Sequence, residues 1–343
     1  MINNKTVLIT GGTGSFGKRI VQILLAKFKP KKLIIFSRDE LKQFEMAQKF
    51  SAHKYPCLSY VLGDVRDKER LMQVFKGVDY VIHAAALKQV PAAERNPEEF
   101  IKTNVLGAMN IIDACLENNV ERVVALSTDK ACNPINLYGA TKLCSDKLFT
   151  AAGFAGAEDG TRFAVVRYGN VLGSRGSVVP FFKERVKTGV LPITDANMTR
   201  FWITLDQAVY FVLESLKRAK GGEIFVPRIP SMKITDLATA VGPKCKQEIV
   251  GIRPGEKIHE TLLSEDEARN AMMFEDCFVV QPNVVLRDGL SKGKGRPCPE
   301  GFKYNSGDND AWLSVTELRK LIDQISDDYA IEESRWSMDD VSE

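Results

Sequence analysis

The sequence predicts an α/β protein in which a doubly wound parallel sheet is joined to a smaller C-terminal part. Three observations support this fold class. Strand-like and helix-like segments alternate through the first half of the chain, which is typical of a parallel sheet covered on both faces. A glycine-rich stretch lies between the first strand and the first helix. After about residue 171 the alternation weakens and the segments become shorter.

The elements can be taken in chain order. We predict strands at "TVLIT", "KLIIFS", "LSYVLGD", "DYVIHAAA", "RVVALS" and "FAVVRYGNV", with helices such as "GKRIVQILLAKF" and "RDELKQFEMAQKF" between them. Their crossovers should be right-handed. We expect one domain over residues 1–171, a second part over residues 172–330 that can return strands or helices to the first, and an acidic tail over residues 331–343. Ser314 and Glu317 predict a capping box at the start of a late helix.

The composition excludes several classes of protein. The 343 residues are 44% hydrophobic and 27% charged with a net charge of +3, which indicates an ordinary globular protein without nucleic-acid partners. No apolar run reaches the roughly 18 residues of a membrane span, and "MINNKTVLIT" does not resemble a signal peptide. The seven cysteines form no CxxC pair, and the chain has three histidines. We therefore expect reduced thiols, no metal site and a cytoplasmic location.

The glycine-rich stretch "TVLITGGTGSFGKRI" predicts a phosphate loop. Gly12, Gly14 and Gly17 match G-x-G-x-x-G, and Gly11, Gly14 and Gly17 match the G-x-x-G-x-x-G variant. Glycine permits a tight turn and a close approach of the backbone, so that the helix N-terminus faces a pyrophosphate. A Rossmann-type dinucleotide domain follows from this motif and its place between strand and helix.

The end of the second strand favours NADP. Ser37 and Arg38 stand where an acidic residue would bind the ribose of NAD, and Arg38 can pair with a 2′-phosphate. Asp39 leaves NAD open as the alternative. The expected cofactor-binding residues are Gly11, Thr13, Gly14, Ser15, Phe16, Gly17, Ser37, Arg38, Asp39, Glu40, Lys42, Asp64, Val65, Ala84, Thr103, Tyr138, Lys142 and Val171.

The stretch "STDKACNPINLYGATK", residues 127–142, carries the candidate chemistry. Tyr138 and Lys142 lie four residues apart, so on a helix they share one face. A lysine ammonium and an oxidised nicotinamide would lower the pKa of the tyrosine and let it take a proton from a sugar hydroxyl. Asp129 and Lys130, just after a strand, add an acid and a base that a simple dehydrogenase does not need.

These motifs resemble the extended short-chain dehydrogenase/reductase family, and within it the inverting UDP-N-acetylglucosamine 4,6-dehydratases of pseudaminic acid biosynthesis. The resemblance covers residues 3 to about 320 and includes "TGGTGSFGK", "SRDELKQ", "GDVRD", "HAAALKQVP", "STDKACNPINLYGATKLCSDKLF", "VRYGNVLGSRGSVVPFF", "MTRFWITL" and "GIRPGEKIHE". It implies oxidation at C4 of the sugar, loss of water across C5 and C6, return of hydride to C6 and inversion at C5.

The resemblance also assigns roles to residues. Lys130 is then the C5 base, Asp129 assists loss of the C6 hydroxyl, and Tyr138 with Lys142 serves the redox step. For Lys130 to act as a base, burial beside the oxidised nicotinamide and Lys142 must depress its pKa, whereas a full salt bridge with Asp129 would leave both groups inert. UDP-N-acetylglucosamine is expected to contact Lys88, Asn170, Arg175, Gly176, Ser177, Val178, Arg200, Arg253 and Glu256. The family further implies a homo-oligomer, dimer-based or hexameric, and a role in glycosylation of flagellin or surface polysaccharide.

Three alternatives remain at this stage. A nucleotide-sugar 4-epimerase or C4 reductase would need Tyr138 and Lys142 but gives Asp129 and Lys130 no role. A retaining dehydratase would differ only in the face on which C5 is reprotonated. An NADP-sensing protein without catalysis would not need the Tyr138–Lys142 pair.

Overall fold

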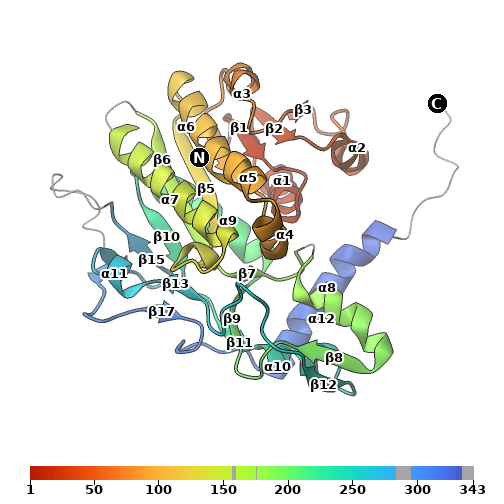
Figure 1. Ribbon diagram of the computed structural model, residues 1–343. Helices are drawn as coiled ribbons and strands as arrows, with labels where there is room; N and C mark the ends of the chain where they lie inside the picture. The colour runs from red at the N-terminus through yellow and green to blue at the C-terminus, as the bar shows by residue number, and fades with distance from the viewer. Residues whose placement is uncertain (157–159, 175, 283–294, 334–343) are drawn as a thin grey trace, which may run out of the picture.

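The computed structural model describes residues 1–156, 160–174, 176–282 and 295–333 (Figure 1). Its main strands are β1 (Thr6–Thr10), β2 (Lys32–Ser37), β3 (Leu58–Leu62), β4 (Tyr80–His83), β5 (Arg122–Thr128), β6 (Arg162–Tyr168), β10 (Ile224–Pro227), β14 (Ala271–Met273), β15 (Cys277–Val280) and β16 (Arg296–Pro297). In the described part of the chain these ten form one sheet in the order β16-β14-β15-β10-β6-β5-β4-β1-β2-β3. Strands β1 to β6 are parallel to one another, and β10 is parallel to β6. The pairs β10–β15, β15–β14 and β14–β16 are antiparallel.

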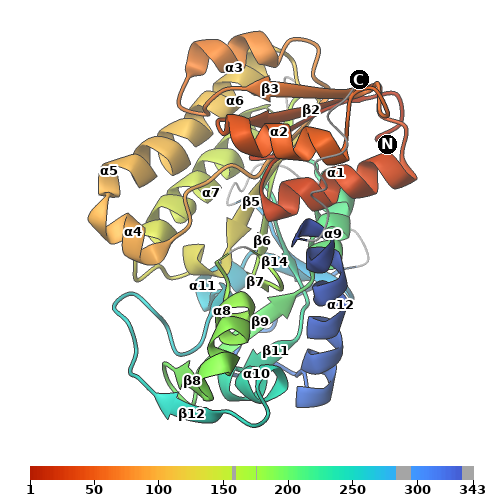
Figure 2. The same ribbon diagram turned by 90° about the vertical axis from the view of Figure 1, so that its right-hand side faces the viewer.

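Helices cover both faces of this sheet (Figures 1 and 2). They are α1 (Ser15–Lys27), α2 (Glu40–Lys49), α3 (Lys68–Val74), α4 (Val90–Arg95), α5 (Pro97–Phe100), the π-helix η1 (Ile101–Leu106), α6 (Gly107–Glu117), the 3₁₀ turn η2 (Asp129–Ala131), α7 (Leu137–Gly156) and α9 (Leu205–Arg218). Strands such as β1 and β4 are buried along their whole length, because side chains on both faces pack under helices. The predicted doubly wound α/β fold is confirmed.

The strand order reverses between β1 and β4. From β1 the chain runs outward to β2 and β3, then returns to β4 and continues on the other side through β5 and β6. In sheets of this kind the loops on the two sides separate at the reversal, which opens a crevice at the carboxyl ends of the strands. The glycine-rich loop after β1 and the segments after β4 and β5 all meet at this crevice.

Smaller elements follow β6. They are β7 (Asn170–Val171), α8 (Val178–Arg185), η3 (Val186–Thr188), β8 (Val190–Ile193), β9 (Thr199–Ile203), β11 (Ser231–Lys233), α10 (Ile234–Val241), β12 (Lys246–Ile249), β13 (Thr261–Leu263), α11 (Glu265–Ala268), β17 (Tyr304–Asn305) and α12 (Val315–Glu333). β7, β9 and β11 form a three-stranded sheet, and β8 pairs with β12. Leu172, Phe182, Leu191, Trp202 and Leu237 belong to a second apolar core among these elements. In Figure 2 this part lies at the opposite end from β3 and α2.

The chain after residue 171 therefore serves both parts. β10, β14, β15 and β16 extend the large sheet, and α9 packs against α1, β5 and β6. The predicted capping box opens α12: Ser314 N–H donates to Glu317 Oε2 at 2.9 Å, and Glu317 N–H donates to Ser314 Oγ at 3.3 Å. Of the predicted acidic tail, residues 334–343 lie outside the described residues. None of the helices that the structure describes is long and apolar enough to cross a membrane.

Candidate active site

A cavity of about 1190 Å³ lies at the carboxyl ends of the parallel strands and reaches the smaller C-terminal part. The structure brings nearly all of the predicted site residues to its wall. The four candidate catalytic residues line it, as do the expected cofactor residues except Glu40, which is exposed at the start of α2. The expected substrate residues line it as well, except Arg175, which lies outside the described residues.

The glycine loop forms a tight cradle at one end of this cavity. Gly11 has φ = 65°, and a Cβ atom there would lie 2.8 Å from the backbone nitrogen of Ala85. A Cβ atom on Gly17 would lie 2.3 Å from the carbonyl oxygen of Gly12, so the first turn of α1 packs directly on the loop. Gly14 caps α1 without a side-chain hydrogen bond and lines the cavity. This arrangement fits a pyrophosphate at the helix N-terminus.

Arg38, Asp39 and Lys42 follow the end of β2, and the carboxylate of Asp39 is hydrogen-bonded to Lys42. Asp39 caps α2 by accepting a hydrogen bond from Lys42 N–H at 3.0 Å, and its other oxygen pairs with Lys42 Nζ at 2.5 Å. The hydrogen bonds from Lys42 hold the pKa of Asp39 below its ordinary value. Arg38 lies with Nη1 3.8 Å from Asp64 Oδ2 and is half exposed. Asp39 and Lys42 are thus paired with each other, and the contact of Arg38 with Asp64 is longer.

Tyr138 and Lys142 occupy one face of α7, and both are buried. Burial raises the pKa of Tyr138 to about 12, although the charge of Lys130 and a hydrogen bond with Thr128 oppose the shift. Burial also lowers the pKa of Lys142, and the nearby Asp146 partly offsets this effect. Both shifts favour uncharged side chains, because burial disfavours the charged form of each group.

Asp129 and Lys130 form the turn η2 directly after β5. Lys130 Nζ lies 3.0 Å from Asp129 Oδ1 and 3.3 Å from Glu260 Oε1. Burial lowers the pKa of Lys130, but the charges of the two carboxylates outweigh it and leave the pKa above its ordinary value. The expected depression is therefore not found: Lys130 forms the ion pair with Asp129 that was the alternative, and Glu260 adds a second carboxylate.

A buried network of ion pairs lies next to the Tyr138–Lys142 pair. Arg167 on β6 is fully buried and pairs with Asp146 Oδ2 at 3.1 Å and with Glu267 Oε2 at 2.8 Å. Ser127 Oγ donates to the same oxygen of Asp146 at 2.8 Å. Asp146 lies one helical turn after Lys142, so this network places a carboxylate beside the dyad lysine.

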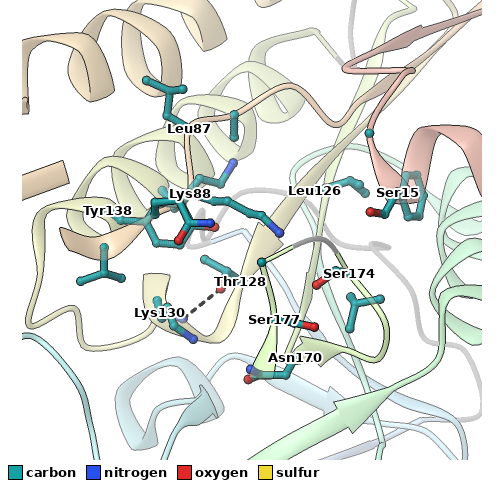
Figure 3. A pocket seen from close by; sticks show the side chains of 18 of the residues that line it. Ser15, Leu87, Lys88, Leu126, Thr128, Lys130, Tyr138, Asn170, Ser174 and Ser177 are labelled. Carbon is teal, nitrogen blue, oxygen red and sulfur yellow. Dashed lines mark hydrogen bonds between the residues drawn. The ribbon is translucent and has the colours of Figure 1, made fainter. Parts of the chain in front are cut away.

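The substrate end of the cavity holds polar atoms without partners. Figure 3 shows Lys130 and Thr128 from the end of β5 and Asn170, Ser174 and Ser177 from the segment after β6 around one space. Within the described residues, Asp129 Oδ2, Asn170 Oδ1 and Ser177 Oγ are buried and have no hydrogen-bond partner. Burial and the charge of Lys130 lower the pKa of Lys88. Unpaired buried groups are costly, so their gathering here fits a polar ligand.

Comparison with known families shows to which family this chain belongs. Residues 7–282 match the family described as "Polysaccharide biosynthesis protein". The chain belongs to this polysaccharide biosynthesis protein family. The match spans the cradle, the turn η2 and the dyad.

Two relatives and one solved structure are similar to this chain over nearly its whole length. It is 56% identical over 331 residues to the UDP-N-acetylglucosamine 4,6-dehydratase (inverting) of Campylobacter jejuni, covering 94% of this chain and 98% of the relative. It is 43% identical to a protein named UDP-glucose 4-epimerase of Rickettsia canadensis, covering 94% and 96%. The solved structure of Pen from Bacillus thuringiensis is 36% identical with a TM-score of 0.87, covering 95% and 99%. The resemblance predicted from the motifs is thus confirmed.

The cavity is also lined by residues that the sequence analysis missed. Glu260 and Thr194 line it, and Trp202 both joins the second apolar core and lines the cavity. Glu260 stands four residues after Glu256 in "RPGEKIHE", and this spacing of two acids was the available signal. Among the described residues no group of three histidines, cysteines or acids could hold a metal ion.

Proposed function

We propose that this protein is an inverting UDP-N-acetylglucosamine 4,6-dehydratase that works with a retained NADP. The observation that carries the proposal is the pairing of the Tyr138–Lys142 dyad with Asp129 and Lys130 in one cavity. A 4-epimerase or reductase would use the dyad alone. The higher identity to the inverting dehydratase, 56% against 43% for the named epimerase, supports the same choice.

The cofactor site fits a nicotinamide dinucleotide, which when bound would supply reversible hydride acceptance. Gly14 and the N-terminus of α1 hold the pyrophosphate, and Thr103 Oγ1, buried without a partner in the described residues, offers a further hydrogen bond. Arg38 and Lys42 bind a 2′-phosphate, which is the basis for choosing NADP over NAD. The commitment of Asp39 to Lys42 and to the cap of α2 supports this choice.

Tyr138 takes the proton of the C4 hydroxyl during oxidation. A neutral tyrosine has a high pKa, so its ionised form must be stabilised when the site is filled. Lys130 supplies positive charge for this purpose, and Lys142 lies on the same helical face as the phenol. Thr128, which hydrogen-bonds the phenol, fixes its direction.

The elimination step uses the turn η2. Lys130 in its neutral form takes the C5 proton, and the electron pair of that C–H bond moves toward the C4 carbonyl. That electron pair then forms the C5=C6 double bond as the C6–O bond breaks. Asp129, protonated on Oδ2, gives this proton to the departing C6 oxygen so that water leaves, and its Oδ1 receives the proton from Lys130 across the 3.0 Å hydrogen bond. Asp129 Oδ2, buried and without a partner among the described residues, is the atom that meets this oxygen.

The same proposal extends to the domains, the cellular location and the assembly of the protein. Residues 1–171 serve as the NADP domain and residues 172–330 mainly as the substrate part, with Arg200, Arg253 and Glu256 near the nucleotide. We place the enzyme in the cytoplasm as a homo-oligomer built from dimers or a hexamer, supplying sugars for pseudaminic acid and flagellin glycosylation. The seven free cysteines support a reducing compartment. Exposed apolar side chains on η1 and α6, among them Leu106, Met109 and Leu116, support assembly.

The experiment that tests the activity is NMR of the purified protein with UDP-N-acetylglucosamine in deuterated water and without added cofactor. The expected product is a 6-deoxy-4-keto sugar nucleotide with solvent deuterium at C5, and its couplings report inversion. Unchanged sugar or only the C4 epimer would overturn the proposal. Retention at C5 would leave dehydration standing and correct the stereochemistry.

A further inference from the structure

Glu260 is a buried carboxylate that the steps above leave without a role. It is 2% exposed and lines the same cavity as the catalytic residues. Its Oε1 atom lies 3.3 Å from Lys130 Nζ and 3.9 Å from Arg200 Nε. Its Oε2 atom lies 4.0 Å from Lys257 Nζ and accepts no hydrogen bond from any described residue. A buried carboxylate is costly unless it is paired, so its position among three cations calls for a reason.

The backbone around Glu260 is held firmly by neighbouring segments. Glu260 N–H donates to Ser306 Oγ at 2.9 Å, and Ser306 N–H donates back to the Glu260 carbonyl at 2.8 Å. Ser306 Oγ also lies 2.7 Å from Thr199 Oγ1 on β9. Lys257 Nζ donates to the carbonyl of Cys132 at 2.7 Å, which ties this segment to the end of the turn η2. The carboxylate is therefore fixed relative to Lys130 before any ligand arrives.

We propose that Glu260 is a positioning residue for the elimination step: its carboxylate fixes the Lys130 amine at the cavity wall and stabilises the ammonium formed when Lys130 takes the C5 proton. This inference rests on the proposed function. Asp129 pairs with the same amine but must also meet the C6 oxygen. Ser306 holds the backbone of Glu260, and in this proposal the Glu260 carboxylate transfers no proton to the sugar, which leaves Asp129 for the leaving group.

The charged groups around Lys130 determine whether a substitution makes its amine a stronger or a weaker base. The titratable and charged groups that face its amine are Asp129 beside it, Glu260 before β13, Arg200 on β9, Tyr138 on α7 and Lys88 after β4. The two carboxylates stabilise the ammonium, and the cations oppose it. Removal of the Glu260 charge should make Lys130 a weaker base that becomes neutral at lower pH. Removal of Lys257, which faces Glu260 from the other side, should do the reverse.

Exchange of the C5 proton isolates the base step from oxidation. The full-length protein with its cofactor is mixed with the 6-deoxy-4-keto product in deuterated water, and loss of the C5 proton is followed by NMR across pH. The Lys130→Met variant gives the background. In wild type the exchange rate should rise with pH and then reach a plateau. In Glu260→Gln this plateau should begin about one to three pH units lower. The plateau rate should also fall, and Glu260→Asp should recover part of both changes.

Two further variants keep the test decisive. Lys257→Met should move the start of the plateau to higher pH, and it answers the question even if Glu260→Gln does not fold. Glu223→Gln removes a buried carboxylate that bonds the backbone N–H of Gly221 away from the cavity, and its curve should match wild type. Equal loss of exchange at every pH in Glu260→Gln, or no upward move in Lys257→Met, would overturn the assignment. If wild type forms no 6-deoxy-4-keto product, the proposed function itself has failed.

Discussion

Asp129 accepts a hydrogen bond from Lys130 Nζ at 3.0 Å through the same oxygen that accepts one from Thr128 Oγ1 at 2.9 Å. Its second oxygen is buried and has no partner among the described residues. One oxygen of this carboxylate is thus committed to the protein and the other is left for a ligand. In the elimination step, the amine of Lys130 can therefore take a proton and the carboxylate of Asp129 can pass one on.

Replacement of Lys130 by methionine should stop the base step and leave oxidation in place. Methionine fills a similar volume without an amine, so we expect C5 exchange to fall by about 10²–10⁴-fold. Stopped-flow absorbance should still detect reduced nicotinamide when UDP-N-acetylglucosamine is added. Lys76→Met, on the exposed turn after α3, serves as the matched control and should behave as wild type. Unchanged C5 exchange in Lys130→Met would show that another group is the base.

The pH dependence of C5 exchange in wild type should reflect the raised pKa of Lys130. The charges of Asp129 and Glu260 keep this side chain protonated, and only its neutral form can take a proton. Below the pKa of Lys130, the neutral fraction grows about tenfold per pH unit, so the rate should rise steadily from neutral to alkaline pH. NMR exchange rates at a series of pH values would measure this slope. A rate that falls as pH rises would contradict a lysine base.

Much of the fold and cavity could be predicted from sequence because the signals are local. The glycine spacing around Gly14 predicted the cradle, and the four-residue spacing of Tyr138 and Lys142 predicted a shared helical face. Charge balance at Lys130 could not be predicted in this way. Glu260 lies 130 residues away in sequence, and only the docking of its segment on η2 brings the two side chains to 3.3 Å.

The same limit applies to Arg167. In sequence it reads as one polar residue within a strand, "FAVVRYGNV", that otherwise resembles buried core. Its partners Asp146 and Glu267 come from a helix and from a distant C-terminal segment, so no periodicity connects them. A local motif thus predicted where single residues lie in the fold, whereas ion pairs that depend on tertiary packing could not be predicted.

Substitution of Arg38 by alanine should shift the cofactor preference from NADP toward NAD. Arg38 and Lys42 supply the positive charge at the end of β2, and the 2′-phosphate is the group that distinguishes the two dinucleotides. A lost charge-assisted contact of this kind is worth about 1.5–3 kcal/mol, or roughly 10–150-fold in affinity. Titration of protein stripped of dinucleotide with NADP and NAD would measure the ratio. Arg162→Ala, exposed at the start of β6, is the control, and an unchanged ratio in Arg38→Ala would refute the assignment.

Replacement of Arg167 by methionine should destabilise the protein, although Arg167 does not line the cavity. The change leaves Asp146 and Glu267 buried without their common partner, and breaking a buried ionic pair costs about 3–5 kcal/mol of unfolding free energy. Urea unfolding would measure this loss. Adding Asp146→Asn to Arg167→Met should cost less than the sum of the two single changes, because the orphaned charge is removed together with its partner. Strictly additive losses would show that Arg167 and Asp146 do not interact, and that the carboxylate beside Lys142 is held by Ser127 alone.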